Sequence, residues 1–141
     1  MFKKLTPNIM VNNVRESVLF YTDNLGFTLN LLVLANTKTI ENKLEEGKEY
    51  SYAMVSRDEI FFMLMEKNAF GEDLPMLKNT SIGASASFYC DISDIDDFYN
   101  SIKNKTEIAI DLHTTWYGMK EFYIKDCNGY VLCFAEAQNK R

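Results

Sequence analysis

The sequence predicts an α+β fold built from two similar modules, whose curved mixed sheets surround a concave cup. Two observations support this prediction. The same order of patterns, one strand, one helix and three strands, occurs twice along the 141 residues. The last strand pattern of each half also agrees in sequence, with Ile60 to Glu66 reading IFFMLME and Tyr130 to Glu136 reading YVLCFAE. Because elements adjacent in the chain usually pack together, each half is expected to form one βαβββ module.

The length favours a single domain over residues 1–141, because domains of this size are common and can bury a substantial core. The modules are expected at about 1–66 and 84–141. The stretch 67–83 contains Gly71, Pro75 and Gly83 and has no sustained hydrophobic period, so it is predicted to connect the two modules.

The first module begins with a strand within residues 5–12, where apolar and polar side chains alternate. A helix is predicted over residues 14–25, because Val14, Val18, Tyr21 and Leu25 recur at helical spacing. Asn13 offers a capping oxygen at its start and Gly26 a stop at its end. The predicted strands that follow cover residues 27–34, 50–56 and 59–66, the last two joined by a turn at Arg57-Asp58. The polar stretch 36–49 between them is interpreted as a long excursion or a frayed hairpin.

The second module repeats this order. A strand is predicted over residues 85–91, and a helix capped by Ser93 or Asp94 follows, with Ile95, Phe98 and Ile102 on one face. Three more strands are predicted over residues 107–112, 119–125 and 130–135. The Asn128-Gly129 pair between the last two predicts a tight hairpin turn with positive φ at both positions.

Composition excludes several classes of function. The chain has 15 Lys and Arg against 20 Asp and Glu, a net charge of −5, and no basic stripe, which disfavours nucleic-acid binding. It has no secretory signal pattern and no run of about 18 apolar residues to span a bilayer. The three cysteines, Cys90, Cys127 and Cys133, lack C-x-x-C spacing. A cytoplasmic location is therefore expected.

Two segments resemble the vicinal oxygen chelate superfamily of glyoxalases, bleomycin-resistance proteins and extradiol dioxygenases. They are residues 6–27, with the pattern Ser-x-x-Phe-Tyr-x-x-x-Leu-Gly-Phe from Ser17 to Phe27, and residues 117–136, with the Asp-x-x-Gly hairpin from Asp126 to Gly129. The sequence is most similar to the bleomycin-resistance-like branch. The resemblance implies paired βαβββ modules, a cup that takes a small ligand, and a homodimer whose modules can be exchanged between chains.

In the metal-dependent members, His, Gln or Glu ligands occupy four matched strand positions, which fall here on Thr6, Met63, Ser87 and Cys133. Only Cys133 is an ordinary metal ligand, so no metal or other cofactor is expected. Glu66 and Glu136 lie three residues from mapped positions and are expected to point to the opposite sheet face, unless a bulge reverses them.

Strand parity divides the predicted sheets into two faces. One face is almost pure hydrocarbon and suits a layer beneath helices, whereas the other is mixed and rich in methionine, a soft side chain that suits a binding cup. No residue is predicted to be catalytic. The candidate ligand-binding residues on the mixed face and at its rim are Asn8, Met10, Phe61, Met63, Met65, Ser87, Tyr89, Trp116, Tyr117 and Cys133.

The sequence therefore predicts a metal-free protein that holds a planar or aromatic organic molecule in the cup, for sequestration or sensing. Two alternatives stay open: a glyoxalase- or dioxygenase-like enzyme that uses a divalent metal ion, and a dimeric scaffold with a filled cup. The single histidine, His113, lies close to the predicted rim, but no nucleophile motif accompanies it.

Overall fold

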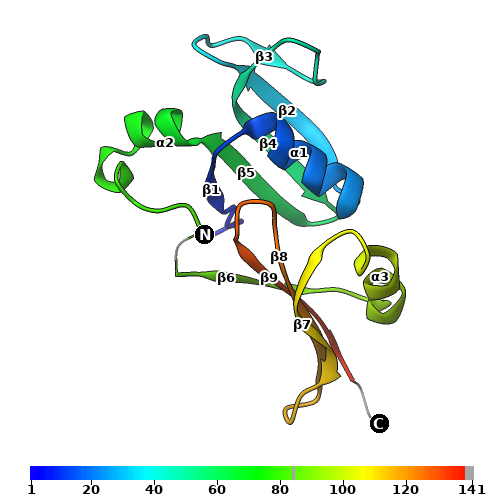
Figure 1. The fold of residues 1–141 in the computed structure, drawn as a ribbon. Helices are drawn as coiled ribbons and strands as arrows, with labels where there is room; N and C mark the ends of the chain where they lie inside the picture. The colour runs from blue at the N-terminus through cyan, green and yellow to red at the C-terminus, as the bar shows by residue number, and fades with distance from the viewer. Residues whose placement is uncertain (84, 139–141) are drawn as a thin grey trace. The chain divides into compact units, whose positions relative to one another are not determined.

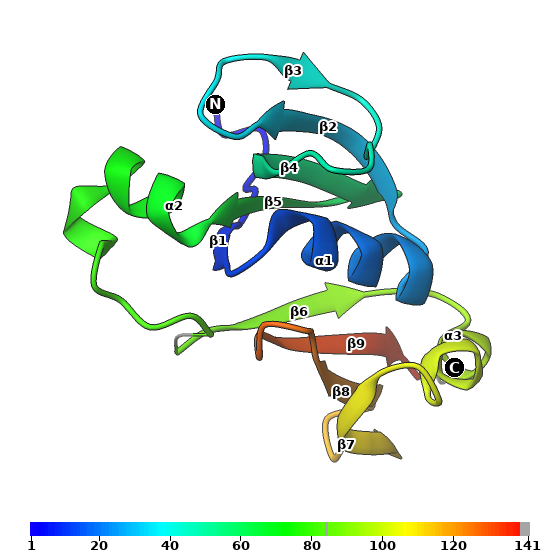
Figure 2. The same ribbon diagram turned by 45° about the horizontal axis from the view of Figure 1, so that its top comes forward.

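The computed structural model describes residues 1–83 and 85–138 and contains two compact units, Met1–Ile82 and Gly83–Arg141. Each unit has one mixed sheet with a helix on one face (Figures 1 and 2). The strand order is β1-β5-β4-β2-β3 in unit 1 and β6-β9-β8-β7 in unit 2. In both sheets the first strand pairs in parallel with the last strand of its unit, and the other pairings are antiparallel. The predicted α+β fold of two βαβββ modules is confirmed.

Unit 1 follows the predicted order closely. Its main elements are β1 (Asn8–Val11), α1 (Val14–Leu19), β2 (Thr28–Leu34), β3 (Ile40–Glu41), β4 (Tyr50–Arg57) and β5 (Ile60–Glu66). The Asn13 side chain caps α1 by accepting from the backbone N–H of Glu16, as predicted. The last turns of this helix widen into a π-helix, Phe20–Asn24, and Gly26 ends it with a φ of 73°. The stretch 36–49 is a hairpin loop with only the short strand β3.

Helix α1 covers one face of the unit 1 sheet and forms the core with it (Figure 2). Tyr21 packs its ring against Phe27 and Phe62, with centroids 5.4 and 5.5 Å apart. A row of register partners, Ile9, Leu64, Ala53 and Leu32, lies on this face. All are buried. These side chains supply the hydrophobic burial that holds the helix to the sheet.

The opposite face of the unit 1 sheet carries two further rows of register partners and is called the Met face below. These rows are Asn8, Met63, Met54 and Leu31, and Met10, Met65, Tyr52 and Val33. Apart from the buried Met10, their side chains are partly exposed. The alternation of faces therefore follows the strand parity that the sequence indicated.

The stretch 67–83, predicted to connect the two modules, contains helix α2 (Lys67–Asp73) and the 3-10 turn η2 (Pro75–Leu77), which the lack of a sustained hydrophobic period did not reveal. The Glu66 carboxylate caps α2 by accepting from the backbone N–H groups of Asn68 and Ala69, at 2.9 and 3.1 Å. A side-chain cap at the end of a strand thus starts a helix that hydrophobic periodicity does not reveal.

Unit 2 contains β6 (Ser87–Asp91), α3 (Ile95–Ile102), β7 (Glu107–Thr114), β8 (Met119–Lys125) and β9 (Val131–Ala137). Phe98 of α3 packs against Phe122 and Phe134, with ring centroids 6.0 and 4.9 Å apart. The helix therefore covers the face that holds these two side chains. The other face carries Tyr89, Cys133, Tyr123 and Ile110 in one row and Asp91, Ala135, Glu121 and His113 in the next.

The prediction for the Asn128-Gly129 turn was wrong in one respect. Gly129 has a φ of 89°, but Asn128 does not have positive φ. The turn starts at Asp126, whose carbonyl accepts from Gly129 N–H at 3.0 Å. Its carboxylate accepts from the backbone N–H groups of Asn128 and Tyr130, at 2.9 and 2.8 Å. Because this carboxylate organises the loop, only the glycine needs the left-handed conformation.

In the part of the chain that the structure describes, no helix is both long enough and apolar enough to cross a membrane.

Candidate functional site

The Met face of unit 1 is soft, apolar and short of hydrogen-bond donors. Thioether side chains are flexible and polarisable, so they adapt to ligands of irregular outline. At one end of the face, Lys4 places its ammonium group 3.6 Å from the centroid of the Phe61 ring. Within this face the side-chain oxygen of Asn8 is buried and has no hydrogen-bond partner among the described residues. A buried acceptor without a donor is unfavourable for the stability of the fold.

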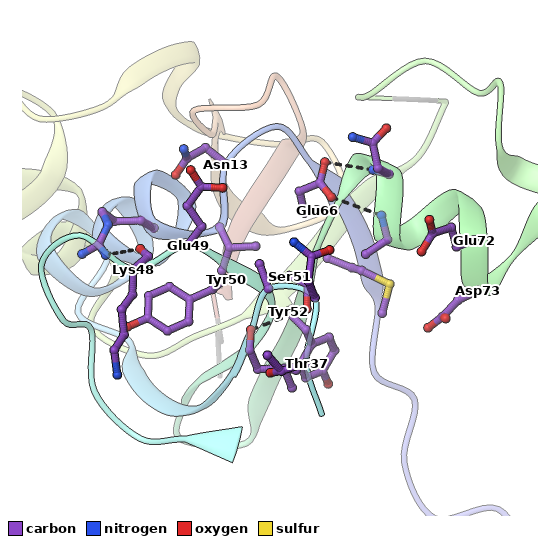
Figure 3. A pocket seen from close by; sticks show the side chains of 18 of the residues that line it. Asn13, Thr37, Lys48, Glu49, Tyr50, Ser51, Tyr52, Glu66, Glu72 and Asp73 are labelled. Atoms are coloured by element: carbon purple, nitrogen blue, oxygen red, sulfur yellow. Dashed lines mark hydrogen bonds between the residues drawn. The ribbon is translucent and has the colours of Figure 1, made fainter. Parts of the chain in front are cut away.

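A pocket of about 970 Å³ lies at one end of the Met face (Figure 3). Val33, Tyr52 and Met65, which form one row of the Met face, supply apolar side chains to it. Most of the lining is polar or charged and comes largely from helix α2 and the loop around β3, with Glu72 and Thr37 among its residues. Burial raises the pKa of Tyr52, so its hydroxyl is a neutral donor or acceptor at physiological pH. The volume of the pocket suits a drug-sized molecule.

Two basic side chains at this pocket, Arg15 and Lys48, have partners within the protein. Arg15 donates to the carbonyl oxygens of Glu45 and Lys48, at 2.5 and 2.6 Å. Lys48 forms ion pairs with Glu41 and Glu45, at 3.0 and 3.2 Å. The hydrogen bond to Glu41 is the largest cause of its raised pKa. Arg15 and Lys48 therefore both bond to groups of the stretch 36–49.

Glu66 and Glu136, which lie three residues from mapped metal positions, both act as helix caps. Glu66 caps α2, and Glu136 accepts from the backbone N–H groups of Asp94 and Ile95, at 3.2 and 3.0 Å, at the start of α3. Asp94, one of the two predicted caps, makes no capping hydrogen bond with its own side chain. The carboxylates at the ends of the two equivalent strands thus satisfy helix N–H groups.

The residues at the mapped metal positions do not fit a divalent ion. Thr6, Met63 and Ser87 supply neither imidazole nor carboxylate, and the buried Cys133 is the only ordinary ligand among the four. Across residues 1–83 and 85–138, no three His, Cys, Asp or Glu side chains come together. A catalytic metal ion of the glyoxalase type needs about three such protein ligands.

The second notable group of side chains is the tyrosine cluster of unit 2, which we define as Tyr89, Tyr117, Glu121, Tyr123 and Cys133. The Glu121 carboxylate is only 1% exposed. Its Oε2 accepts from the hydroxyls of Tyr89 and Tyr117, at 2.5 and 2.8 Å. These hydrogen bonds raise the pKa of both phenols, which therefore stay protonated. The cluster is an anionic centre enclosed by neutral hydroxyl groups.

Cys133 lies at the base of the cluster and is completely buried. Burial raises the pKa of its thiol to about 11, so it is a neutral group at physiological pH. A hydrogen bond with this thiol is the main reason why the pKa of Tyr123 rises to about 12. The thiol is therefore a structural group rather than a nucleophile.

The ten candidate binding residues are divided between the two units. Asn8 lies opposite Met63 and Met10 opposite Met65 in the unit 1 register, and Tyr89 lies opposite Cys133 in unit 2. Unit 1 contains Asn8, Met10, Phe61, Met63 and Met65, and unit 2 contains Ser87, Tyr89, Trp116, Tyr117 and Cys133. Of these, only Met65 lines the 970 Å³ pocket.

Sequence reasoning missed four residues that complete these surfaces: Tyr52, Met54, Glu121 and Tyr123. The missing signal was strand parity. Residues 50–56 and 119–125 were predicted as strands, but their alternate positions were not assigned to faces, although the same period of two applies. His113 lies in strand β7 opposite Glu121, and its Nδ1 is 2.8 Å from the carbonyl oxygen of Asp111.

Comparison with solved structures finds the same fold in several proteins of low sequence identity. TioX from Micromonospora sp. ML1 is 13% identical, with a TM-score of 0.69 over 96% of this chain and 99% of that one. A glyoxalase/bleomycin resistance protein/dioxygenase from Nocardioides is 15% identical, with a TM-score of 0.70 over 100% of this chain and 88% of that one.

A member of the same superfamily from Sphaerobacter thermophilus is 14% identical, with a TM-score of 0.70 over 96% and 98% of the two chains. None of the curated proteins compared with the sequence matches it. The family model of the Glyoxalase/Bleomycin resistance protein/Dioxygenase superfamily matches residues 5–134. The chain therefore belongs to this superfamily, as its sequence resemblance indicated.

Proposed function

We propose that this protein binds a small planar organic molecule against the Met face of unit 1, without a metal ion, and acts in sequestration or sensing. The observation that carries the proposal is the 970 Å³ pocket, whose mainly polar lining includes an apolar side formed by Val33, Tyr52 and Met65. Soft apolar side chains recognise shape, and a few polar groups orient the ligand.

Binding without a metal ion is supported by the donor chemistry. The side chains at the mapped positions are those of Thr6, Met63, Ser87 and Cys133, which give hydroxyl, thioether and thiol groups. Recognition would then depend on burial of the ligand's apolar surface and on its stacking against Tyr52. Elemental analysis of protein purified without a chelator is expected to find no bound metal, and about one ion per chain would favour the alternative of a metal-dependent enzyme.

A thermal-shift screen with planar phenols, polycyclic antibiotics and glutathione conjugates tests the proposal. A ligand present at 100 times its dissociation constant adds about 2.7 kcal/mol to the free energy of unfolding. At least one planar compound is expected to raise the melting temperature. A broad panel without any shift would overturn the proposal and favour the scaffold with a filled cup.

The site is tested by Met65→Arg, which places a charge in the apolar side of the pocket. Met76→Arg is the matched control, because Met76 is 77% exposed on η2 and does not line the pocket. Met65→Arg is expected to weaken binding at least tenfold, and Met76→Arg to leave it unchanged. Met63→Arg extends the test along the Met face. Equal affinity in all three variants would remove the Met face from consideration.

From the family resemblance we also propose that the protein is a homodimer in the cytoplasm. Light scattering during size-exclusion chromatography is expected to give twice the mass of one chain.

A further inference from the structure

The tyrosine cluster of unit 2 contains features that the proposed function does not use. Tyr89 and Tyr117 are 48% and 50% exposed, yet both hydroxyls bond to one oxygen of a carboxylate that is 1% exposed. Each ring is therefore fixed at its hydroxyl end and open to solvent over much of its surface. Trp116 adds a third ring, 94% exposed, which meets Tyr117 edge to face with centroids 5.2 Å apart.

Within the described part of the chain, the Glu121 carboxylate has no cationic partner. No Lys, Arg or His forms an ion pair with Glu121 among the described residues. The two lysines on its own strand are engaged elsewhere, since Lys120 pairs with Asp96 at 2.6 Å and Lys125 with Glu107 at 3.9 Å. A buried carboxylate without a counter-ion is unfavourable, and hydroxyl donors satisfy its hydrogen bonds without cancelling its charge.

Exposed aromatic rings beside a buried carboxylate favour an organic cation as ligand. The faces of aromatic rings attract cations, most strongly when the cation is weakly hydrated, and quaternary ammonium groups are often held by several such rings. A carboxylate that accepts from the phenol hydroxyls adds negative charge close to the same rings. A metal ion is a poorer match, because the cluster offers a single carboxylate and no group of three metal-binding side chains.

We propose that Tyr89, Tyr117 and Trp116 form a site for an organic cation of the quaternary or highly alkylated ammonium class, with Glu121 as the buried counter-charge. The site lies wholly in unit 2 and goes beyond the proposed function, which rests on the Met face of unit 1. Variants in the two units therefore separate the two proposals: Met65→Arg changes no residue of this site, and substitution of Glu121 changes no residue of the Met face.

A matched pair of probes tests the proposal on the full chain. The cation 3-hydroxyphenyltrimethylammonium and its neutral isostere 3-tert-butylphenol have nearly the same shape and differ in charge. Titrations followed by the indole fluorescence of Trp116, the single tryptophan, and by calorimetry give both dissociation constants. The cation is expected to bind about tenfold more tightly. Equal or reversed affinities would overturn the proposal.

Two variants and one control locate the effect. Glu121→Gln removes the charge but keeps an acceptor oxygen, so the preference for the cation is expected to fall to about twofold or less. Tyr117→Leu removes one ring and should have a similar effect, whereas Tyr117→Phe keeps the ring and should lose less. The control is Asp111→Asn, because Asp111 accepts from the half-buried Tyr99 at 3.1 Å in a second tyrosine–carboxylate pair of unit 2.

If Asp111→Asn lowers the preference as much as Glu121→Gln does, the attraction comes from general acidity and the proposal fails. It also fails if both Glu121→Gln and Tyr117→Leu keep the wild-type preference. Circular dichroism shows whether each variant is folded, and Tyr117→Phe serves as the readout should Glu121→Gln unfold, since the Tyr117 ring is half exposed and tolerates the change.

Discussion

The two units show how one βαβββ pattern can present two different surfaces. In both, the helix covers a hydrocarbon face, and the other face carries the variable side chains. Unit 1 places thioethers and Tyr52 on this face, whereas unit 2 places Tyr89, Tyr123 and Glu121 there. The helix-covered faces hold each unit together, and the opposite faces are free to specialise. A repeated module therefore fixes a scaffold without fixing its chemistry.

The largest effect on the free energy of unfolding is expected when substitutions at two neighbouring residues, on opposite faces of strand β5, are compared. Leu64 is completely buried beneath α1, while Met63 lies on the Met face and is partly exposed. Leu64→Ala should cost about 3 kcal/mol, because it leaves a cavity in the core, and Met63→Ala about 1 kcal/mol or less. Urea unfolding followed by circular dichroism measures both. Similar losses would mean that the two faces are packed alike.

A medium effect is expected from the two capping carboxylates. Glu136→Ala should cost about 1 to 2 kcal/mol, because it leaves two backbone N–H groups unpaired at the start of α3, which covers the unit 2 core. Glu66→Ala removes the same number of bonds from α2 and should cost about 0.5 to 1 kcal/mol. Hydrogen exchange of the first helical turn should accelerate in each variant only at its own helix, and faster exchange at both helices would contradict independent caps.

The smallest effect on stability at neutral pH is expected from the tyrosines of unit 2. Their contribution becomes visible only at alkaline pH. The pKa of Tyr89 and Tyr117 is raised in the folded state by hydrogen bonds to Glu121, and that of Tyr123 to about 12. Their contribution to stability is complete below the unfolded pKa of about 10 and is lost as pH rises through the folded values. The free energy of unfolding should therefore decline above about pH 10.

Tyrosinate absorbance during alkaline titration measures this directly. The phenols of the tyrosine cluster should ionise late in the wild type and earlier in Glu121→Gln, which lacks the carboxylate charge. The same titration in Asp111→Asn should leave Tyr89 and Tyr117 unchanged. A wild-type curve that coincides with that of Glu121→Gln would show that Glu121 does not hold these protons.

Much of the fold could be predicted because local rules and tertiary packing agree. Asn13 has a capping side chain and lies directly before a helical period, so the start of α1 was visible in the sequence. The hydrocarbon face was also visible, since alternate positions in the strands share one environment. The helix α2 was not, because its start depends on the side chain of Glu66, which reads equally well as the end of a strand.

The candidate site was harder to predict, because it depends on contacts between distant segments. Glu121 acquires its role from Tyr89, 32 residues earlier in the chain, and from Tyr117 at the preceding turn. His113 lies near two register shifts in the β7–β8 pairing, where simple parity fails. Positions in regular strands could be assigned to faces from sequence, whereas hydrogen bonds across strands could not.

The parallel pairing of first and last strands has a consequence for how the chain is made. β1 pairs with β5, and β6 with β9, so each sheet joins segments separated by most of its own unit. Such long-range closure is slow, because the entropy of a large loop is lost before its contacts form. During synthesis, a unit can close its sheet only after its final strand has left the ribosome. The N-terminal unit is thus free to mature while its successor is still incomplete.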